Sequence, residues 1–517
     1  MRIMAKKPSR IALHLRLTRP LATAYMLGLL SSTGPRLIHI LFLLGKGKLG
    51  IRAAWMQFTT ILRQAVAPHR FPTFCGVLIG GSTLLQIPIK NLILFLRYSL
   101  RSPSRSIDFI PTRQAAQFIA AIVSAAVSFH LLNTAPTKPS MPSGTELAQP
   151  STHLEPCEPG PFDEPPEIYS QDIDHTTLQA RSLSRTDLAG RTMDLTLFSI
   201  IRALDIIVSR AWRATPFSKD SSRLRFISWS SPSLLFCFSA ATIMHAWFYS
   251  PSRLPQTFDR WISAAAELDH RLLLALRHAR YGTWIYGKDT GMAPLLGSMC
   301  RDYGFSEDWG NPALTIPVPC ELVHMGRGGK SCEKHAFLRF CRSWAFAAKM
   351  YAPLQFLVLV RSARARSRHG NRSGLTWDAL LRATIDMARS SAFLGAFIAF
   401  FYYGVCLSRT RLGPKVFSSS TISPQMWDSG LCVLSGCLLC GPSILIEQSR
   451  KRLEILFFVL PRAAATWFPR RYLPEHRWKE HLAFTISAAV VLTTAQGHPK
   501  RVRGVLGNVL HGVLKIE

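Results

Sequence analysis

Residues 118–128 read Phe-Ile-Ala-Ala-Ile-Val-Ser-Ala-Ala-Val-Ser, a stretch of apolar and small side chains without a charge. It lies inside a longer apolar segment, residues 115–132. A bilayer core takes about 20 helical residues, so a segment of this length crosses it or nearly crosses it. Seven more segments share this character: 71–89, 195–212, 233–249, 391–407, 431–446, 453–468 and 482–496. The sequence therefore predicts an all-α, polytopic membrane protein of about eight spans. The alternative is a large soluble α-helical enzyme in which these segments are core helices.

The eight segments form two sets of four in the same order along the chain. The pattern Phe-x-Gly-x-x-Ile opens both sets, with Gly76 in the first and Gly395 in the second. Lipid gives no hydrophobic drive between helices, so small residues that let two backbones approach are valuable at helix crossings. The sequence therefore predicts two four-helix repeat modules, with Gly76 and Gly395 at equivalent helix-packing positions.

The charge of the chain is strongly positive and unevenly placed. Among 517 residues there are 62 Lys and Arg against 30 Asp and Glu, and no acidic residue precedes Asp108. A basic, acid-free N-terminal region suits an organelle-targeting signal or a surface held against anionic headgroups. The basic residues flank apolar runs and do not alternate with stacking aromatic residues, so we expect membrane lipids as partners and no nucleic acid. A homo-oligomer remains open.

Composition divides the chain into six regions. Residues 1–70 are a basic N-terminal region, in which 21–30 and 37–44 are candidate interfacial helices. The first module, 71–250, contains an acidic, Pro-rich insertion at about 136–180 that we expect to be disordered. The remaining regions are a connector at 251–315, a cysteine-rich region with an interfacial helix at 316–362, the second module at 388–500 and a basic tail at 501–517.

The cysteine-rich region contains a candidate metal site. Cys320, His324, Cys332 and His335 follow the pattern Cys-x3-His-x7-Cys-x2-His. Thiolates and imidazoles are the ligands that zinc prefers, and a tetrahedral site would staple a short loop. The spacing matches no standard zinc finger, and Gly-rich residues 326–329 separate the two halves. A structural zinc ion, a disulfide, and packed cysteines beside solvated histidines are the three hypotheses, and the sequence requires no other cofactor.

Two further groups of residues stand out. Arg202 and Asp205 are three residues apart inside the segment 195–212, so they share a helix face and an ion pair between them is possible. Charged residues within a span usually face a bundle interior or a cavity; the alternative is that this segment lies partly in the interface. Lys349, Tyr351 and Pro353 indicate a short interfacial or re-entrant helix, with Pro353 as a kink.

The order of these motifs is specific. The Cys/His cluster is followed by Lys349-Met-Tyr-Ala-Pro-Leu, by Ser391-Ala-Phe-Leu-Gly, and by Ile444-Leu-Ile-Glu with a basic run at 449–452. Over residues 317–500 this order resembles the amino-terminal half of the transmembrane protein 135 family. The first module is similar, more loosely, to that family's second half, although here a whole module precedes the cysteine-rich region. More distantly, the chain resembles the four-span mitochondrial import-channel and peroxisomal membrane proteins.

The resemblance implies residence in the mitochondrial or peroxisomal membrane and a role in organelle dynamics and lipid metabolism. It supplies no catalytic residue. A transporter or channel for small molecules or lipids is the alternative, with Arg202, Asp205 and His130 as the polar groups of its path. We expect no enzyme, because no nucleophile–base pair, pair of catalytic carboxylates or cofactor loop emerges from the sequence.

The eight apolar segments predict that the protein is integrated in a membrane. After carbonate extraction of membranes it should stay in the pellet, because carbonate removes proteins held by charge but not those held by spans. A protein found in the supernatant would contradict integration and favour the soluble alternative.

Overall fold

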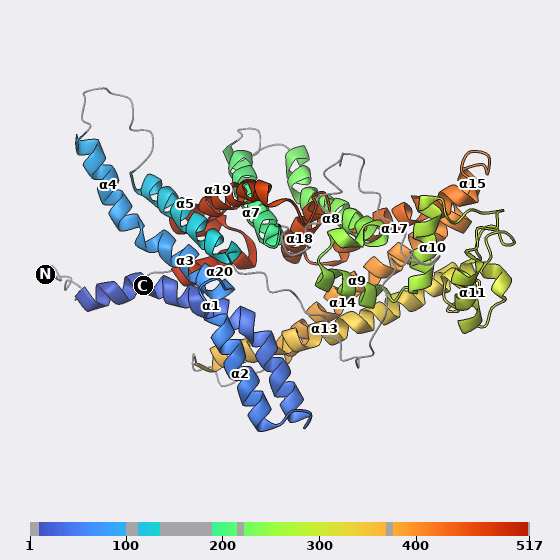
Figure 1. Ribbon diagram of the computed structural model, residues 1–517, viewed down its shortest axis with the longest axis horizontal. Helices are drawn as coiled ribbons and strands as arrows, with labels where there is room; N and C mark the ends of the chain where they lie inside the picture. Colours follow the sequence, from blue (N-terminus) through green and yellow to red (C-terminus); the bar gives the residue numbers. More distant parts are fainter. Residues whose placement is uncertain (1–9, 100–111, 135–188, 215–221, 369–375, 515–517) are drawn as a thin grey trace, which may run out of the picture. The chain divides into compact units, whose positions relative to one another are not determined.

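The computed structural model describes residues 10–99, 112–134, 189–214, 222–368 and 376–514 (Figure 1). Within these ranges the regular secondary structure is entirely helical, and the one β-bridge joins Ala189 to Tyr472. The predicted all-α class is confirmed for this part of the chain. The helices form two compact units, which are described separately. The predicted insertion at 136–180 lies outside the described residues.

The first unit is built by helices from both ends of the chain. α1 packs on α3, α3 packs on α5, and α19 packs against both α5 and α7. Small residues allow these approaches: Ser124 of α5 donates to the carbonyls of Val77 and Leu78 in α3. The helices are α1 (Arg10–Gly45), α2 (Ile51–Ala65), α3 (Phe71–Leu84), α4 (Gln86–Ser99), α5 (Thr112–Asn133), α7 (Met193–Ala214), α19 (Arg477–Gly497) and α20 (Gly504–Leu514).

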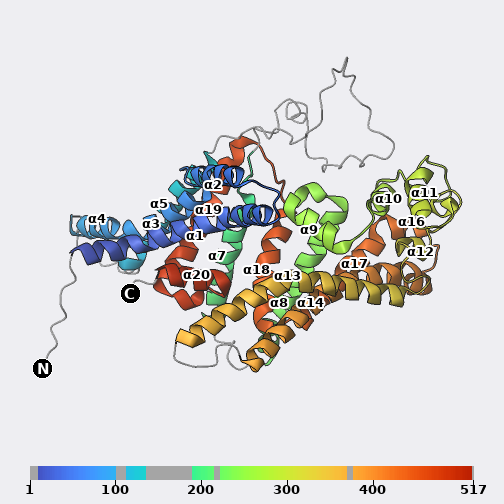
Figure 2. The same cartoon turned by 90° about the horizontal axis from the view of Figure 1, so that it is seen from below.

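The second unit is built by the middle of the chain. α13 packs along α14, α14 packs on α17, and α8 packs against both α17 and α18 (Figure 2). The helices are α8 (Ser222–Tyr249), α9 (Gln256–Ala266), α10 (His270–Tyr281), α11 (Ala293–Asp302), α12 (Cys320–Val323), α13 (Cys332–Arg368), α14 (Trp377–Cys406), α15 (Gly413–Val416), α16 (Pro424–Met426), α17 (Cys432–Cys440) and α18 (Ser449–Ala465). The predicted connector, 251–315, supplies α9, α10 and α11, and side chains of all three belong to the core of this unit.

The two units repeat one order of packing. In the first, neighbours follow the order α1, α3, α5, α19, α7; in the second, the order is α13, α14, α17, α8, α18. Each unit contains three of the four segments of one predicted set and one segment of the other set. The exchanged segments are 233–249, which is α8 in the second unit, and 482–496, which is α19 in the first. The grouping therefore differs from the predicted modules. The internal repeat itself stays a prediction, which this shared order favours.

In the part of the chain that the structure describes, seven helices are long and apolar enough to cross a membrane, and they indicate an integral membrane protein. They are Thr18–Gly45, Phe71–Leu96, Thr112–Asn133, Phe226–Tyr249, Cys332–Arg364, Trp377–Val416 and Pro424–Ile446. Three predicted spans (195–212, 453–468 and 482–496) are not among them. α18 has only 17 residues, and α7 and α19 carry more polar side chains. Two candidate spans were not predicted as spans: Thr18–Gly45 lies in the region predicted to hold interfacial helices, and Cys332–Arg364 lies in the cysteine-rich region.

Three local expectations differ from the structure. The stretches 21–30 and 37–44 are parts of a single helix, α1, and not separate interfacial helices. α13 has 37 residues and continues through Pro353 to Arg368, so no short re-entrant helix ends there. Lys349 is exposed and Tyr351 is half-buried. The predicted basic tail contains α20, which buries Gly507, Leu510 and Val513.

Gly76 and Gly395 are both buried against the helix that begins their unit's packing order. A Cβ atom added to Gly76 would lie 3.4 Å from the Tyr25 side chain of α1, and one added to Gly395 would lie 3.1 Å from the Phe340 carbonyl oxygen of α13. We expect Gly76→Leu and Gly395→Leu each to destabilise the protein by about 1–3 kcal/mol through overpacking. Thermal unfolding of the purified protein in detergent measures this.

A matched control is Gly34→Ala in α1, where nothing lies within 4 Å of the added Cβ. It should leave the unfolding temperature unchanged or raise it, because alanine favours helix over glycine. A leucine tolerated at Gly76 but not at Gly395 would contradict the equivalence of the two positions.

Candidate metal centre

Three thiols and one imidazole converge in the second unit. Cys320, His324, Cys332 and Cys406 place one ligand atom each within 4.8 Å of the others, so the cluster could hold a metal ion. The His324 Nε2 atom lies 3.3 Å from the Cys406 sulfur. His324, Cys332 and Cys406 are buried, whereas Cys320 is half-buried. Three of the four predicted ligands are therefore brought together, and Cys406 takes the place of His335.

The ends of three helices position the cluster. Cys320 begins the single turn α12, and His324 is the residue that ends it. Cys332 begins α13 and Cys406 ends α14. Because α13 and α14 are consecutive helices that pack along each other, the start of one meets the end of the next (Figure 2).

A glycine turn brings His324 and Cys332 together. Gly326, Gly328 and Gly329 have φ values of +69°, +87° and +58°, a backbone region that side chains disfavour. At Gly328 the space is also closed, because an added Cβ would lie 2.9 Å from the His335 backbone. Packing therefore fixes this glycine-rich turn.

Hydrogen bonds to the loop orient both histidines. The Nδ1 atom of His324 lies 2.9 Å from the Gly329 carbonyl oxygen. Because only a protonated nitrogen can bond a carbonyl, Nδ1 carries the proton and the Nε2 lone pair faces the sulfurs, as a metal ligand requires.

His335 supports His324 and is not part of the four-atom cluster. Its ring stacks on that of His324 with centroids 4.2 Å apart and planes at 12°. Its own Nδ1 is held 3.1 Å from the Arg327 carbonyl oxygen, and Tyr402 packs edge-on against its ring. The predicted ligand His335 thus lies outside the cluster: it is one turn into α13, where its ring stacks on that of His324.

At Cys320 the surroundings favour the thiolate, the form that binds metals. Hydrogen bonding with Cys406 lowers the pKa of the Cys320 thiol to about 5, against the opposing effect of burial. Thr410 also lies 3.5 Å from the Cys320 sulfur. The Arg411 guanidinium lies beside Cys332 and forms an ion pair with Glu333 at 3.2 Å.

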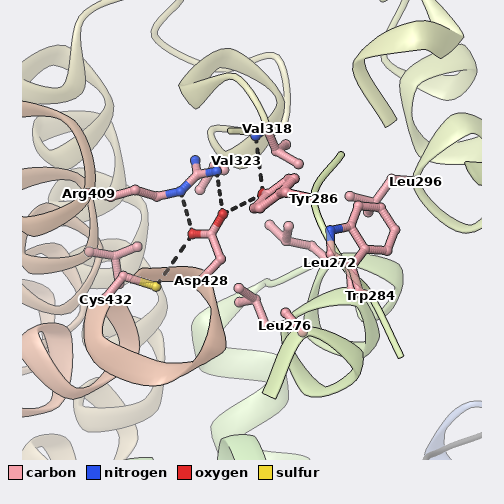
Figure 3. A pocket seen from close by; sticks show the side chains of 13 residues that line it. Leu272, Leu276, Trp284, Tyr286, Leu296, Val318, Val323, Arg409, Asp428 and Cys432 are labelled. Atoms are coloured by element: carbon pink, nitrogen blue, oxygen red, sulfur yellow. Dashed lines mark hydrogen bonds and ion pairs between the residues drawn. The ribbon is translucent and has the colours of Figure 1, made fainter. Parts of the chain in front are cut away.

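A buried ion pair lies next to the cluster along the chain. Arg409 binds Asp428 through two hydrogen bonds of 2.6 and 2.8 Å, and both side chains are about 95% buried. Tyr286 donates to Asp428 and accepts from the Val318 amide (Figure 3). Burial raises the pKa of Tyr286, which keeps its hydroxyl a donor.

This ion pair lies on two π-helical turns, Leu407–Arg411 and Trp427–Leu431. It borders a cavity of about 30 Å³ whose other walls are mostly apolar, including Trp284 and Leu296 (Figure 3). A cavity of this size accommodates about one or two water molecules. The pair therefore fixes the chain beyond Cys406 and does not form a substrate pocket. Sequence reasoning missed it, because isolated Arg and Asp residues outside the apolar runs gave no signal.

The predicted pair Arg202 and Asp205 is connected through a third residue in the first unit. Arg202 is buried and donates to the carbonyl of Arg503, and the Arg503 guanidinium forms an ion pair with Asp205. Arg503 follows α19, so this network holds α7 to the C-terminal segment. His130, the third polar group of the transporter alternative, is exposed.

A buried carboxylate in the first unit was also not predicted from the sequence. Glu480, at the start of α19, accepts hydrogen bonds from Thr192 at 2.7 Å, from Thr196 at 3.1 Å and from Tyr472. Further along the same two helices, Ser487 donates to Ser199 at 2.9 Å. Such polar contacts join helices where lipid provides no hydrophobic drive. They explain how α7 and α19 pair although neither qualifies as a span by composition.

Comparisons with protein-family models, with curated proteins and with solved structures find no match to this chain. The resemblance of residues 317–500 to the transmembrane protein 135 family therefore stays a prediction. The geometry of the four-residue cluster is the firmest guide to the chemistry of this chain.

The ligand set predicts which substitutions abolish metal binding. Cys332→Ser and Cys406→Ser should each reduce the metal content of the purified protein from about one ion per chain to near zero. His335→Phe should keep the ion with affinity reduced about 10–100-fold, as expected of a residue that orients a ligand. Elemental analysis with a chelator competition measures both quantities. Complete loss of metal in His335→Phe together with retention in Cys406→Ser would contradict the assignment.

Proposed function

We propose that Cys320, His324, Cys332 and Cys406 hold a structural zinc ion. Three sulfurs and one imidazole nitrogen are a donor set that zinc takes in tetrahedral sites. With three thiolates the centre would carry a net charge of −1, next to the Arg411–Glu333 ion pair. The protein fills all four positions, which leaves none for a water molecule or substrate. A closed site of this kind contributes folding energy and not catalysis.

The ion would cross-link three parts of the second unit. Its ligands come from α12, from the first residue of α13 and from the last residue of α14. Since an unfolded chain has no such preformed site, binding stabilises only the folded arrangement. The predicted role of the centre is to hold the α13–α14 pair and the preceding loop in one geometry.

We propose further that this is a multi-pass protein of the mitochondrial or peroxisomal membrane with a role in membrane dynamics and lipid metabolism, as its resemblance to the transmembrane protein 135 family implies. One observation carries the proposal. Two of the motifs on which the resemblance rests, the Cys/His stretch and the segment from Ser391 to Gly395, form one packed structure. Gly395 lies against Phe340 of α13, and the helix that contains Gly395 ends at the ligand Cys406.

Imaging of the tagged full-length protein against mitochondrial and peroxisomal markers tests this location. We expect its signal to coincide with one of the two organelles. Residence in the secretory pathway or plasma membrane would contradict the family proposal. The Cys406→Ser variant separates the zinc proposal from the location proposal. It should be found in the same organelle at lower abundance, because the substitution reduces stability and does not change targeting.

A further inference from the structure

Helix α2 (Ile51–Ala65) has an apolar face that the rest of its unit only partly covers. Ala54 and Ala65 are buried in the unit, which packs α2 against α1. Next to them on the helix, Ile51, Trp55, Phe58 and Leu62 follow the spacing i, i+4, i+7, i+11, which places them in one row. Ile51 and Trp55 are 79% and 66% exposed, and Trp55 stacks on Phe58 with ring centroids 5.6 Å apart. We call these four residues the α2 strip.

A basic edge borders the α2 strip. Arg52 and Arg63 are eleven residues, about three helical turns, apart and therefore lie on the same side of α2. On the helical projection this side adjoins that of Ile51 and Trp55, at about 100° per residue. Lys46 and Lys48 lie in the turn just before the helix. All four are exposed, and no acidic residue occurs before Asp108.

The position of α2 in the chain places it close to a membrane surface. It begins at Ile51, and five residues separate it from the end of the candidate span Thr18–Gly45. Five residues reach about 17 Å when extended, so the start of α2 stays within or next to the headgroup layer. With 15 residues α2 is too short to cross a bilayer itself.

We propose that the α2 strip and its basic edge form a docking surface for an anionic phospholipid bilayer. The apolar row would enter the boundary between acyl chains and headgroups, with the tryptophan at headgroup depth, while Arg52 and Arg63 reach the phosphates. A second copy of the chain is a poor occupant, because docking would bring two acid-free basic surfaces together. This proposal is independent of the zinc centre, which lies in the other unit.

Hydrogen–deuterium exchange of the full-length protein in nanodiscs tests the surface. One set of discs contains phosphatidylcholine alone, and the other contains phosphatidylcholine with phosphatidylserine. Amides of residues 51–65 should exchange more slowly in the anionic discs. Arg52→Gln/Arg63→Gln should lower that protection by up to about 30-fold, from roughly fivefold for each basic residue near an anionic surface.

Two variants sharpen the result. Trp55→Ser keeps the arginines but removes the apolar anchor, so it too should lose the protection. Lys288→Gln/Lys415→Gln removes the same charge from exposed positions in the other unit and should leave exchange at 51–65 unchanged. Equal exchange of 51–65 in neutral and anionic discs would overturn the proposal. So would protection that depends on protein concentration, which indicates a second copy as the occupant.

Discussion

The convergence of Cys320, His324, Cys332 and Cys406 at one end of the α13–α14 pair constrains much of the second unit. The cluster brings the last residue of α14 next to the first residue of α13. His335 stacks behind it on His324, and Tyr402 packs on His335. Tyr402 and Arg339 in turn donate to the carbonyl of Ala266 at the end of α9. A single group of ligands is therefore connected by packed side chains to the helices of the predicted connector.

At the same end of the unit, a buried ion pair also holds the chain together. Arg409 and Asp428 lie on π-helical turns that separate α14 from α17, so their ion pair closes the turn that Cys406 begins. Removing one partner from such a buried pair would leave an uncompensated charge, which costs about 3–5 kcal/mol. Because the thiolates and the ion pair occupy adjacent turns, metal binding and the packing of the α14–α17 hairpin are expected to support each other.

Sequence reasoning located the helices well but not their partners. Apolar runs mark where a helix forms, and small residues such as Gly76 and Gly395 mark where it is approached closely. Neither identifies which helix approaches, so the placement of α8 and α19 in each other's units could not be read from the chain. The polar contacts of Glu480 and Ser487, which hold α19 to α7, became recognisable only once those two helices were paired.

The candidate metal site also shows which residues the sequence can identify and which only the fold reveals. Cys320, His324 and Cys332 are close in sequence, so their spacing was enough to select them; Cys406 is distant and looked like one more small residue in an apolar run. X-ray absorption at the zinc edge of the purified protein decides between the two ligand sets. Our account predicts three sulfur ligands at about 2.3 Å and one nitrogen at about 2.0–2.1 Å. Two sulfurs with two nitrogens, or a purified protein without zinc, would contradict it.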